Sequence, residues 1–428
     1  MKDSQNIAVN GENSSSLIGR VIKFLEERRN RILRGEINCI PLPFNRFKSE
    51  MPGIEQGSYY LISGGTKAGK SQLANYLFVY NTILYSYYNP EEVKPKIFYY
   101  NLEETPEAIT LRFMSYLLFR LSKGRYKVSS NELRSVRYAL PIEVIDILES
   151  DEYKNILNYY EECIDFRESQ NPTGCWKDLY NYAEMNGTTY RKKVENIDPL
   201  TGEITTKEVF DYYVPNNPNE YVFIIYDHLS LLGTEKGMSL RESMNKLSEY
   251  MVHLRNKFNY IPVVIQQQSQ ENQSNDAVKL GRLRPSVSGL SDSKYTSRDC
   301  DVMLGLFNPY SYDLDSYLGY DIKQLKGNAR FLEVVVNRHG VSNGICPLIF
   351  LGEVCHFKEL PLPNDTINMN KVYNSLSELK KNTIDKVFFL FNKNKSEKDI
   401  DNKKRVFNFA NFLKNGKLYN YFRPKWHW

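Results

Sequence analysis

Short apolar runs alternate with helical patterns along most of this chain of 428 residues. The runs have the length of buried strands, and the segments between them repeat apolar residues every three or four positions, as one face of a helix does. The runs that predict strands are residues 58–63, 96–102, 221–226, 262–267, 302–307, 331–336, 347–350 and 354–357. The segments that predict helices are residues 72–80, 106–121 and 239–258. Strands that alternate with helices favour an α/β fold with a mostly parallel, twisted sheet flanked by helices.

A separate amphipathic helix is predicted for residues 16–34, ahead of the main body. Its apolar residues recur at helical spacing, a serine run can cap its start, and Gly35 can end it. Its charged residues predict a basic outer face. The extended, proline-containing segment 38–44 separates this helix from the body. The apolar stripe therefore docks either on its own chain or on a neighbouring copy, and the pattern leaves both open.

An insertion is predicted in the middle of the chain. Residues 122–190 have the patterns of further helices, and residues 190–214 alternate around Pro199-Leu200-Thr201-Gly202, which is typical of a hairpin. We expect a disordered start and linker helix in residues 1–40 and a core in residues 41–360, with the insertion at about 123–219. Residues 361–428 form a C-terminal extension.

Composition predicts a soluble, intracellular protein. Hydrophobic residues make up 41% and charged residues 25% of the chain, close to the globular average. No apolar run approaches the roughly 20 residues of a membrane span, and the polar start lacks the apolar stretch of a secretory signal. Six cysteines without a C-x-x-C pair encode neither a disulfide framework nor a zinc ribbon. We therefore expect a cytoplasmic location and no membrane partner.

Charge is concentrated in the C-terminal extension. Residues 371–428 hold 14 basic and 5 acidic residues, although the whole chain carries only +5 at pH 7. With its tyrosines and tryptophans, this tail has the chemistry to contact phosphates and stack on bases. It can equally be a solvated helical appendage whose aromatic residues pack on the body. Composition does not decide between these interpretations.

One segment has the pattern of a phosphate-binding loop. The match to G-x-x-x-x-G-K-[ST] falls between a predicted strand and a predicted helix, and it runs Gly64-Gly65-Thr66-Lys67-Ala68-Gly69-Lys70-Ser71. In such a loop the backbone N–H groups surround phosphate oxygens at the positive end of the following helix. Lys70 is expected to reach the β- and γ-phosphates, and the Ser71 hydroxyl to bind Mg²⁺. The loop predicts ATP and Mg²⁺ as cofactors.

Two predicted strand ends supply candidate carboxylates. Asp227 ends the apolar run 221–226, where an acid can contact the magnesium shell through water. Glu103 and Glu104 follow the run 96–102, and we favour Glu103 as the general base that polarises the attacking water. The alternative is that the glutamates only place negative charge in the first turn of the helix near Pro106, and the pair can serve both purposes.

Two further strand ends carry candidate catalytic groups. The run 262–267 leads into Gln268, whose neutral amide can hydrogen-bond the γ-phosphate and report its loss to the following loop. Three consecutive glutamines can also be a polar strand exit. Arg338 follows the run 331–336, where an arginine is either a surface charge or a finger that stabilises transition-state charge in a second subunit.

The ordered set of motifs resembles that of the DnaB-type replicative helicases, hexameric motors with a RecA-like core, in a form typical of bacteriophages. The resemblance spans about residues 41–357. It rests on GGTKAGKS, on NLEET followed by Arg112, and on FIIYDHLSLL, PVVIQQQSQ, RPSVSGLSDSKYTSRDCDVMLGL and VVNRHGVSNG. These segments are similar to the family's phosphate loop, catalytic-glutamate segment, Walker B strand, sensor strand and two later motifs.

The resemblance implies a homo-oligomer, expected to be a hexamer, that hydrolyses ATP and translocates on single-stranded DNA. It implies that Glu103 is the catalytic glutamate, Asp227 the Walker B acid and Gln268 the sensor, and that Arg338 acts in the adjoining subunit. Channel loops that contact DNA are implied to hold Lys279, Arg282 and Arg284, with Lys294 a weaker candidate. A primase or loader is a further implied partner, and the host bacterial cytoplasm the implied location.

Three departures from the family pattern stand out. Val336 occupies the place of a lysine that precedes the finger arginine, so stabilisation in trans is expected to be weaker. The family's N-terminal helical domain is not found ahead of the linker helix. The insertion has no counterpart in the resemblance. Two competing hypotheses are a RecA-like recombinase or DNA-stimulated ATPase that does not unwind DNA, and a non-catalytic nucleotide-binding adaptor or virion protein.

Overall fold

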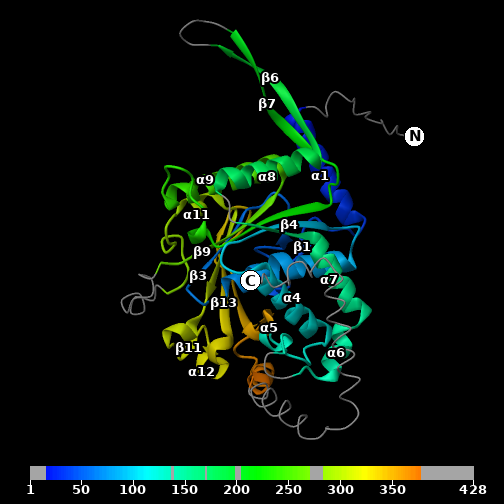
Figure 1. Cartoon of the computed structure of the whole chain (residues 1–428). Coiled ribbons are helices and arrows are strands. Elements are labelled where there is room, and N and C mark those ends of the chain that lie inside the picture. The colour runs from blue at the N-terminus through cyan, green and yellow to red at the C-terminus, as the bar shows by residue number, and fades with distance from the viewer. Residues whose placement is uncertain (1–15, 136–138, 169–170, 198–203, 270–282, 377–428) are drawn as a thin grey trace, which may run out of the picture.

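The structure is a computed structural model that describes residues 16–135, 139–168, 171–197, 204–269 and 283–376. Its centre is a nine-stranded sheet in the order β15-β14-β13-β10-β3-β9-β8-β4-β5. In that order the strands are His356–Glu359, Ile345–Leu351, Ala329–Asn337, Val302–Phe307, Tyr60–Gly64, Ile261–Gln267, Glu220–Asp227, Lys94–Asn101 and Ile164–Arg167. The strands from β10 to β5 are parallel, and β13, β14 and β15 form an antiparallel edge. The mostly parallel sheet is therefore confirmed (Figure 1).

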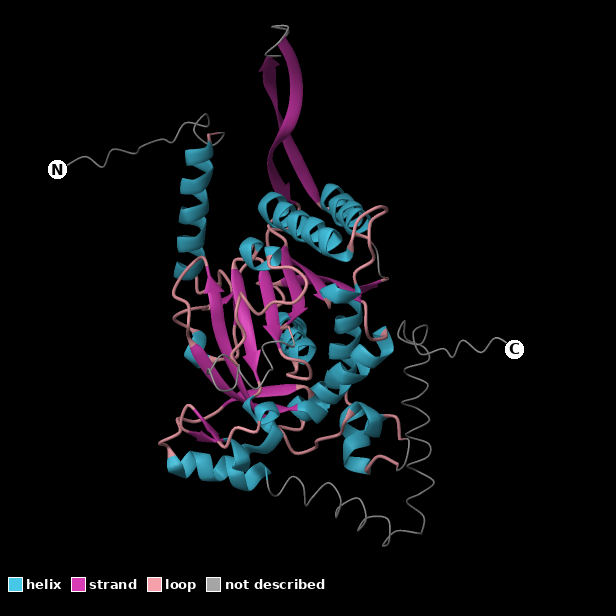
Figure 2. Ribbon diagram, turned by 90° about the vertical axis from the view of Figure 1, so that its left-hand side faces the viewer, coloured by secondary structure: helices cyan, strands magenta, loops and turns pink. Residues whose placement is uncertain are grey.

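Helices cover both faces of this sheet, which is why its central strands are apolar on both sides. In β8, Phe223 and Ile225 belong to one core cluster, whereas Ile224 and Tyr226 belong to the other. Side chains of α4 (Pro106–Leu121), α6 (Ile142–Leu148) and α7 (Asp151–Cys163) join the first cluster. Those of α8 (Pro172–Met185) and α9 (Leu240–Phe258) join the second. The result is a three-layered α/β core (Figures 1 and 2).

Two segments differ from the sequence prediction. The helix predicted for residues 72–80 is longer and is divided into α2 (Lys70–Ala74), the π-helical η2 (Asn75–Tyr80) and α3 (Asn81–Tyr88). The purely helical interpretation of residues 122–190 is wrong at Ile164–Arg167, which form the edge strand β5. Four residues are too few to show a strand alternation. Their partner, β4, lies far away in sequence, so local pattern cannot reveal the pairing.

Smaller elements complete the described chain. They are β1 (Ile40–Pro41), η1 (Asn45–Phe47), β2 (Gly53–Ile54), α5 (Ser130–Leu133), η3 (Leu229–Leu231), α11 (Tyr295–Asp299), η5 (Pro309–Tyr312), β11 (Ser316–Tyr317), β12 (Tyr320–Asp321), α12 (Ile322–Leu325), η6 (Lys326–Asn328) and η7 (Gly352–Val354). The elements from η5 to α12 follow β10 and pack around a third apolar cluster that includes Phe307, Tyr320 and Leu360. This cluster lies at the end of the sheet where β3 and β10 terminate.

The predicted N-terminal helix is present as α1 (Leu17–Leu33), with the Ser16 side chain capping its first turn. Three of its arginines contact the body of the chain. Arg20 pairs with Asp211 at 3.7 Å and Arg28 with Glu55 at 3.2 Å, and Arg31 Nη1 donates to Asn219 Oδ1 at 2.8 Å. The expected basic outer face is therefore wrong for these arginines, because acidic and amide groups distant in sequence attract them.

The apolar stripe of α1 points away from the body as a consequence. Ile18 is 73% exposed, Leu25 58% and Ile32 58%, and no residue of the helix is buried. The body of the described chain does not cover this stripe. Docking on its own chain, one of the two open interpretations, is thus not what the structure of a single chain shows.

The predicted hairpin consists of β6 (Gly187–Ile197) and β7 (Ile204–Pro215), paired in antiparallel register. Figures 1 and 2 show it projecting from the body. Its base is anchored: Tyr213 donates to Ala183 O at 3.0 Å and packs edge-on against Phe258. The turn predicted at residues 199–202 lies outside the described residues, as do residues 1–15 and the basic tail from residue 377 onward.

Membrane and disulfide expectations can be compared with the described residues. No described helix has both the length and the apolar character needed to cross a membrane. All six cysteines are free thiols, and only Cys39 among them is not buried. The domain limits at residues 40, 123, 219 and 360 remain predictions.

Candidate nucleotide site

The predicted phosphate loop joins the end of β3 to the start of α2, as its pattern requires. Gly64 is the last residue of β3, and a Cβ there would lie 2.5 Å from Leu306 O. Gly69 precedes α2 with φ 101°, a left-handed conformation, and a Cβ there would meet the Phe350 ring at 3.2 Å. Glycine is thus needed at these positions for space and for backbone conformation. We call this end of the sheet the P-loop edge.

Lys70 is buried at the start of α2, with 7% of its surface exposed. Its Nζ donates to Gly65 O at 2.9 Å, so the side chain folds back over the loop. Burial lowers the pKa of Lys70, and the charges of Asp227 and Glu103 act in the opposite sense. The ammonium group is therefore held at the mouth of the loop, where a phosphate would replace the carbonyl as its partner.

Ser71 and Asp227 meet across the sheet, because α2 begins beside the end of β8. Ser71 Oγ donates to Asp227 Oδ1 at 2.9 Å, and Tyr99 OH donates to Asp227 Oδ2 at 3.3 Å. Burial raises the pKa of Asp227 to about 6; the Ser71 hydrogen bond opposes this shift, and the charges of Glu104 and Glu103 add to it. No cation in the described parts of the chain forms an ion pair with this carboxylate.

This pair fits a magnesium ion that a nucleotide helps to hold. Among the described residues, no group of three or more His, Cys, Asp or Glu side chains converges as a metal cage. Mg²⁺ is commonly bound by one or two carboxylates together with substrate phosphates. One hydroxyl and one buried carboxylate beside a phosphate loop are the protein's share of such a site.

The two glutamates after β4 are separated in role by their contacts. Glu104 forms a two-pronged ion pair with Arg112 of α4, in which Arg112 Nη2 lies 2.5 Å from Glu104 Oε1. The Glu103 side chain is 58% exposed, with Oε2 lying 3.6 Å from His228 Nε2. Glu104 is thus occupied, and Glu103 is the carboxylate available to polarise water.

His228 was not identified from the sequence. It follows Asp227 directly, its side chain is 11% exposed, and its Nδ1 is buried without a hydrogen-bond partner in the described structure. Burial lowers the pKa of His228, and the Glu103 charge opposes that effect, so the ring is neutral at pH 7. The only sequence signal was its position next to the Walker B acid.

Gln268 connects the P-loop strand to the loop that follows β9. Its Nε2 donates to Ser63 Oγ at 2.8 Å and to Ser286 O at 3.1 Å, and its own backbone N–H donates to Gly64 O at 3.1 Å. It is 7% exposed. A movement of the P-loop is therefore transmitted through Gln268 to the loop at Ser286.

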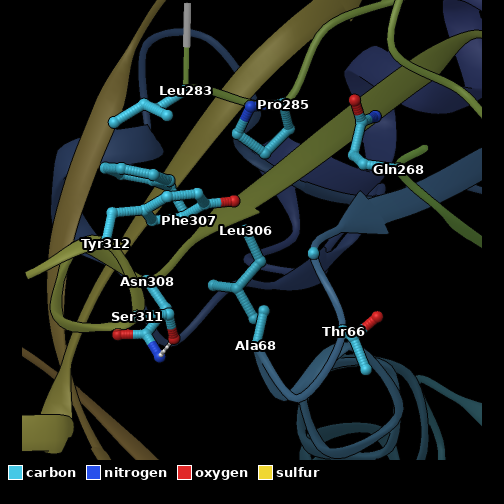
Figure 3. A pocket seen from close by; sticks show the side chains of 11 residues that line it. Thr66, Ala68, Gln268, Leu283, Pro285, Leu306, Phe307, Asn308, Ser311 and Tyr312 are labelled. Carbon is cyan, nitrogen blue, oxygen red and sulfur yellow. Dashed lines mark hydrogen bonds between the residues drawn. The ribbon is translucent and has the colours of Figure 1, made fainter. Parts of the chain in front are cut away.

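A cavity of about 140 Å³ adjoins the loop. Thr66, Ala68 and Gln268 line it on one side, and Phe307, Asn308 and Tyr312 line the other (Figure 3). Asn308 Nδ2 donates to Ser311 Oγ at 2.7 Å, while Asn308 Oδ1 is buried without a partner among the described residues. The cavity extends the site from the phosphate loop toward the end of β10.

Arg338 lies at the other edge of the sheet. Along β10, Leu306 is opposite Gly64, whereas Val302 is opposite Asn337. These levels are four residues apart, or about 13 Å at a strand rise of about 3.3 Å per residue. The Arg338 side chain is exposed, and no described residue forms an ion pair or hydrogen bond with it. The structure therefore does not bring Arg338 to the phosphate loop of its own chain.

The candidate DNA-contacting residues are only partly described. Lys279 and Arg282 lie outside the described residues. Arg284 is 45% exposed and pairs with Glu333 of β13 at 3.6 Å. Lys294 is exposed immediately before α11.

No protein-family model and no curated protein matches the chain. Among solved structures, the chain is similar to the ATPase domain of a phage helicase, with a TM-score of 0.55 and 16% identity over 81% of this chain and 99% of that one. It is also similar to a DnaB-like replicative helicase described with its interactions with primase, with a TM-score of 0.55 and 16% identity over 81% of this chain and 67% of that one. The chain has the fold of helicase ATPase domains, so the resemblance inferred from the motifs is confirmed at the level of fold.

Proposed function

We propose that this chain is an ATP-hydrolysing DNA helicase of the DnaB-like type that moves along single-stranded DNA. One observation carries the proposal: Lys70, Ser71 and Asp227 meet at the P-loop edge, with Glu103 across from them, in a helicase ATPase fold. The three buried groups supply phosphate and magnesium contacts. The exposed glutamate supplies the base.

The residues of this chain divide the chemistry among them. Lys70 exchanges the Gly65 carbonyl for the β- and γ-phosphates, while Ser71 and Asp227 hold Mg²⁺, which neutralises phosphate charge when bound. Glu103 orients and deprotonates the attacking water. Gln268 changes its hydrogen bonds when the γ-phosphate leaves, and its bond to Ser286 conveys this to the following loop.

Two features support assembly of identical subunits, in the proposal a hexameric ring. Arg338 is about 13 Å along the sheet from its own phosphate loop, and its side chain has no partner in the described chain, as expected of a finger that serves a neighbour. The outward apolar stripe of α1 needs a cover that a neighbouring copy can supply. Opposite edges of one chain meeting give a head-to-tail contact, which closes into a ring when the rotation allows.

DNA is proposed to pass the loops between β9 and β10, where Lys279, Arg282 and Arg284 supply phosphate contacts that do not depend on sequence. The basic tail is a further candidate for nucleic-acid contact. A primase or loader as partner, and a bacteriophage replisome in the host cytoplasm as setting, complete the proposal and rest on the motif resemblance.

Unwinding of a forked duplex by the full chain with ATP tests the proposal. We expect strand displacement by the unaltered chain and none by Lys70→Ala, with ring-shaped particles in negative-stain images. ATP hydrolysis without displacement on any fork, together with open filaments on DNA, would indicate a recombinase-like ATPase instead. Tight ATP binding without turnover at high protein concentration would indicate a non-catalytic adaptor.

A further inference from the structure

Arg330 is a buried arginine beneath the phosphate loop that neither the motifs nor the fold comparison assigned. It lies on β13 with 5% of its surface exposed. Its Nε donates to Ala68 O at 2.6 Å, and its Nη1 donates to Gly327 O and Ala329 O, each at 2.8 Å. The guanidinium also lies over the Phe350 ring, 5.2 Å from its centroid.

The hydrogen-bond partners of this guanidinium within the described chain are neutral carbonyl groups. No carboxylate in the described parts of the chain forms an ion pair with it. Arg255 offers a contrast, since it is similarly buried and holds Asp301 through two contacts of 2.8 and 2.7 Å. An unpaired buried charge is costly, and burial accordingly lowers the pKa of Arg330 to about 10. The free chain thus contains an uncompensated positive charge next to a loop built for anions.

The contact with Ala68 also sets the direction of the loop. A trans peptide unit points its carbonyl and the following N–H to opposite sides. Because Ala68 O is directed at Arg330, the N–H of Gly69 is directed away from it, toward the inside of the loop. Phosphate oxygens are bound there by loop N–H groups.

We propose that Arg330 is a positioning residue of the nucleotide site, which orients the Ala68–Gly69 peptide and whose charge is balanced by the phosphates of the bound nucleotide. This inference rests on the proposed ATP binding. It implies that Arg330 contributes to affinity for the phosphates and not for the nucleoside, and that its charge is of little use to the empty chain.

The test measures dissociation constants of the full-length chain for ATP and for adenosine, by competition with a fluorescent ATP analogue. For Arg330→Met we expect the ATP dissociation constant to rise at least about tenfold, as for loss of one charge-assisted contact, with adenosine binding unchanged. Arg330→Lys keeps the charge and should lose less. The thermal unfolding midpoint without nucleotide should not fall, because the removed charge was unpaired.

Arg255→Met is the matched control. It leaves Asp301 buried without its cation, so it should lower the unfolding midpoint while leaving the ATP dissociation constant unchanged. If Arg330→Met does not fold, the same constants measured on Arg330→Lys and Arg330→Gln decide, with Gln expected to be the weaker ATP binder.

ATP affinity within threefold of the unaltered chain, or an equal loss for ATP and adenosine, would overturn the inference. An unaltered chain that does not bind ATP at all would contradict the proposed function itself. The two failures are therefore separable.

Discussion

The two edges of the central sheet differ in how complete they are. At the P-loop edge, Lys70, Ser71, Asp227 and Gln268 are largely buried and bonded to other groups of the same chain. At the opposite edge, the Arg338 side chain is exposed without a described partner, and α1 turns its apolar stripe outward. One edge is preorganised for its ligand before the ligand arrives. The other has groups that acquire a role only in contact with another molecule.

This difference indicates that the catalytic site is divided between chains. A buried, hydrogen-bonded set loses little freedom on binding nucleotide, which is the preorganisation that electrostatic stabilisation requires. An exposed arginine contributes nothing to that set until an interface removes it from water. Turnover should then depend on assembly even though nucleotide binding does not.

The largest expected effect comes from removing the arginine at the open edge. Arg338→Ala should lower kcat by a factor on the order of 10³, with ATP affinity of the single chain unchanged, because a finger acts on the transition state. Steady-state ATPase assays across protein concentration measure this. Mixing Arg338→Ala with Lys70→Ala should restore part of the turnover, and equal rates for isolated chains and assemblies would remove the division between edges.

The next effect sharpens the difference between two neighbouring glutamates. Glu103→Gln should lower kcat by about 10²- to 10⁴-fold while ATP still binds, because the amide cannot take the water proton. Glu104→Gln is the matched control: it weakens the ion pair with Arg112 and should cost far less in kcat. If Glu104→Gln were the more damaging substitution, the base would have to be reassigned.

A third prediction concerns the outward stripe of α1. Leu25→Glu should weaken assembly by about ten- to hundredfold in dissociation constant, the expected consequence of losing burial of one leucine side chain. Sedimentation with an ATP analogue measures the change. Lys23→Glu, on the same helix, is the control that alters charge without altering the stripe. Unchanged assembly of Leu25→Glu would show that no copy covers it.

The smallest effect is a pH dependence at the preorganised edge. Burial raises the pKa of Asp227 to about 6, so Mg²⁺ must compete with a proton below that pH. Apparent Mg²⁺ affinity in the presence of ATP should fall about tenfold between pH 6 and pH 5. Because the folded chain takes up this proton before the unfolded chain does, the same group makes the free energy of unfolding rise as pH falls from about 6 toward 3.8. Asp227→Asn should abolish both trends.

Sequence pattern anticipated the P-loop edge well. The loop residues, Asp227, Glu103 and Gln268 all sit where a strand ends, and strands of a parallel sheet end at one edge, so local pattern plus topology places them together. The pattern missed His228, whose contact with Glu103 joins two strand ends, and Arg330, whose partner Ala68 is 262 positions away in the chain. Neither position breaks any local rule that a sequence would reveal.

The amino-acid order by itself determined where α1 begins and ends, which strands are apolar on both sides, and which backbone positions require glycine. These properties depend on contacts within a few residues, so they are written in the local pattern. The direction of the α1 stripe, the pairing of β5 with β4, the choice between Glu103 and Glu104, and the unpaired charge of Arg330 were decided only in three dimensions. Each depends on a partner distant in the chain, and charge and burial act through space rather than along the backbone.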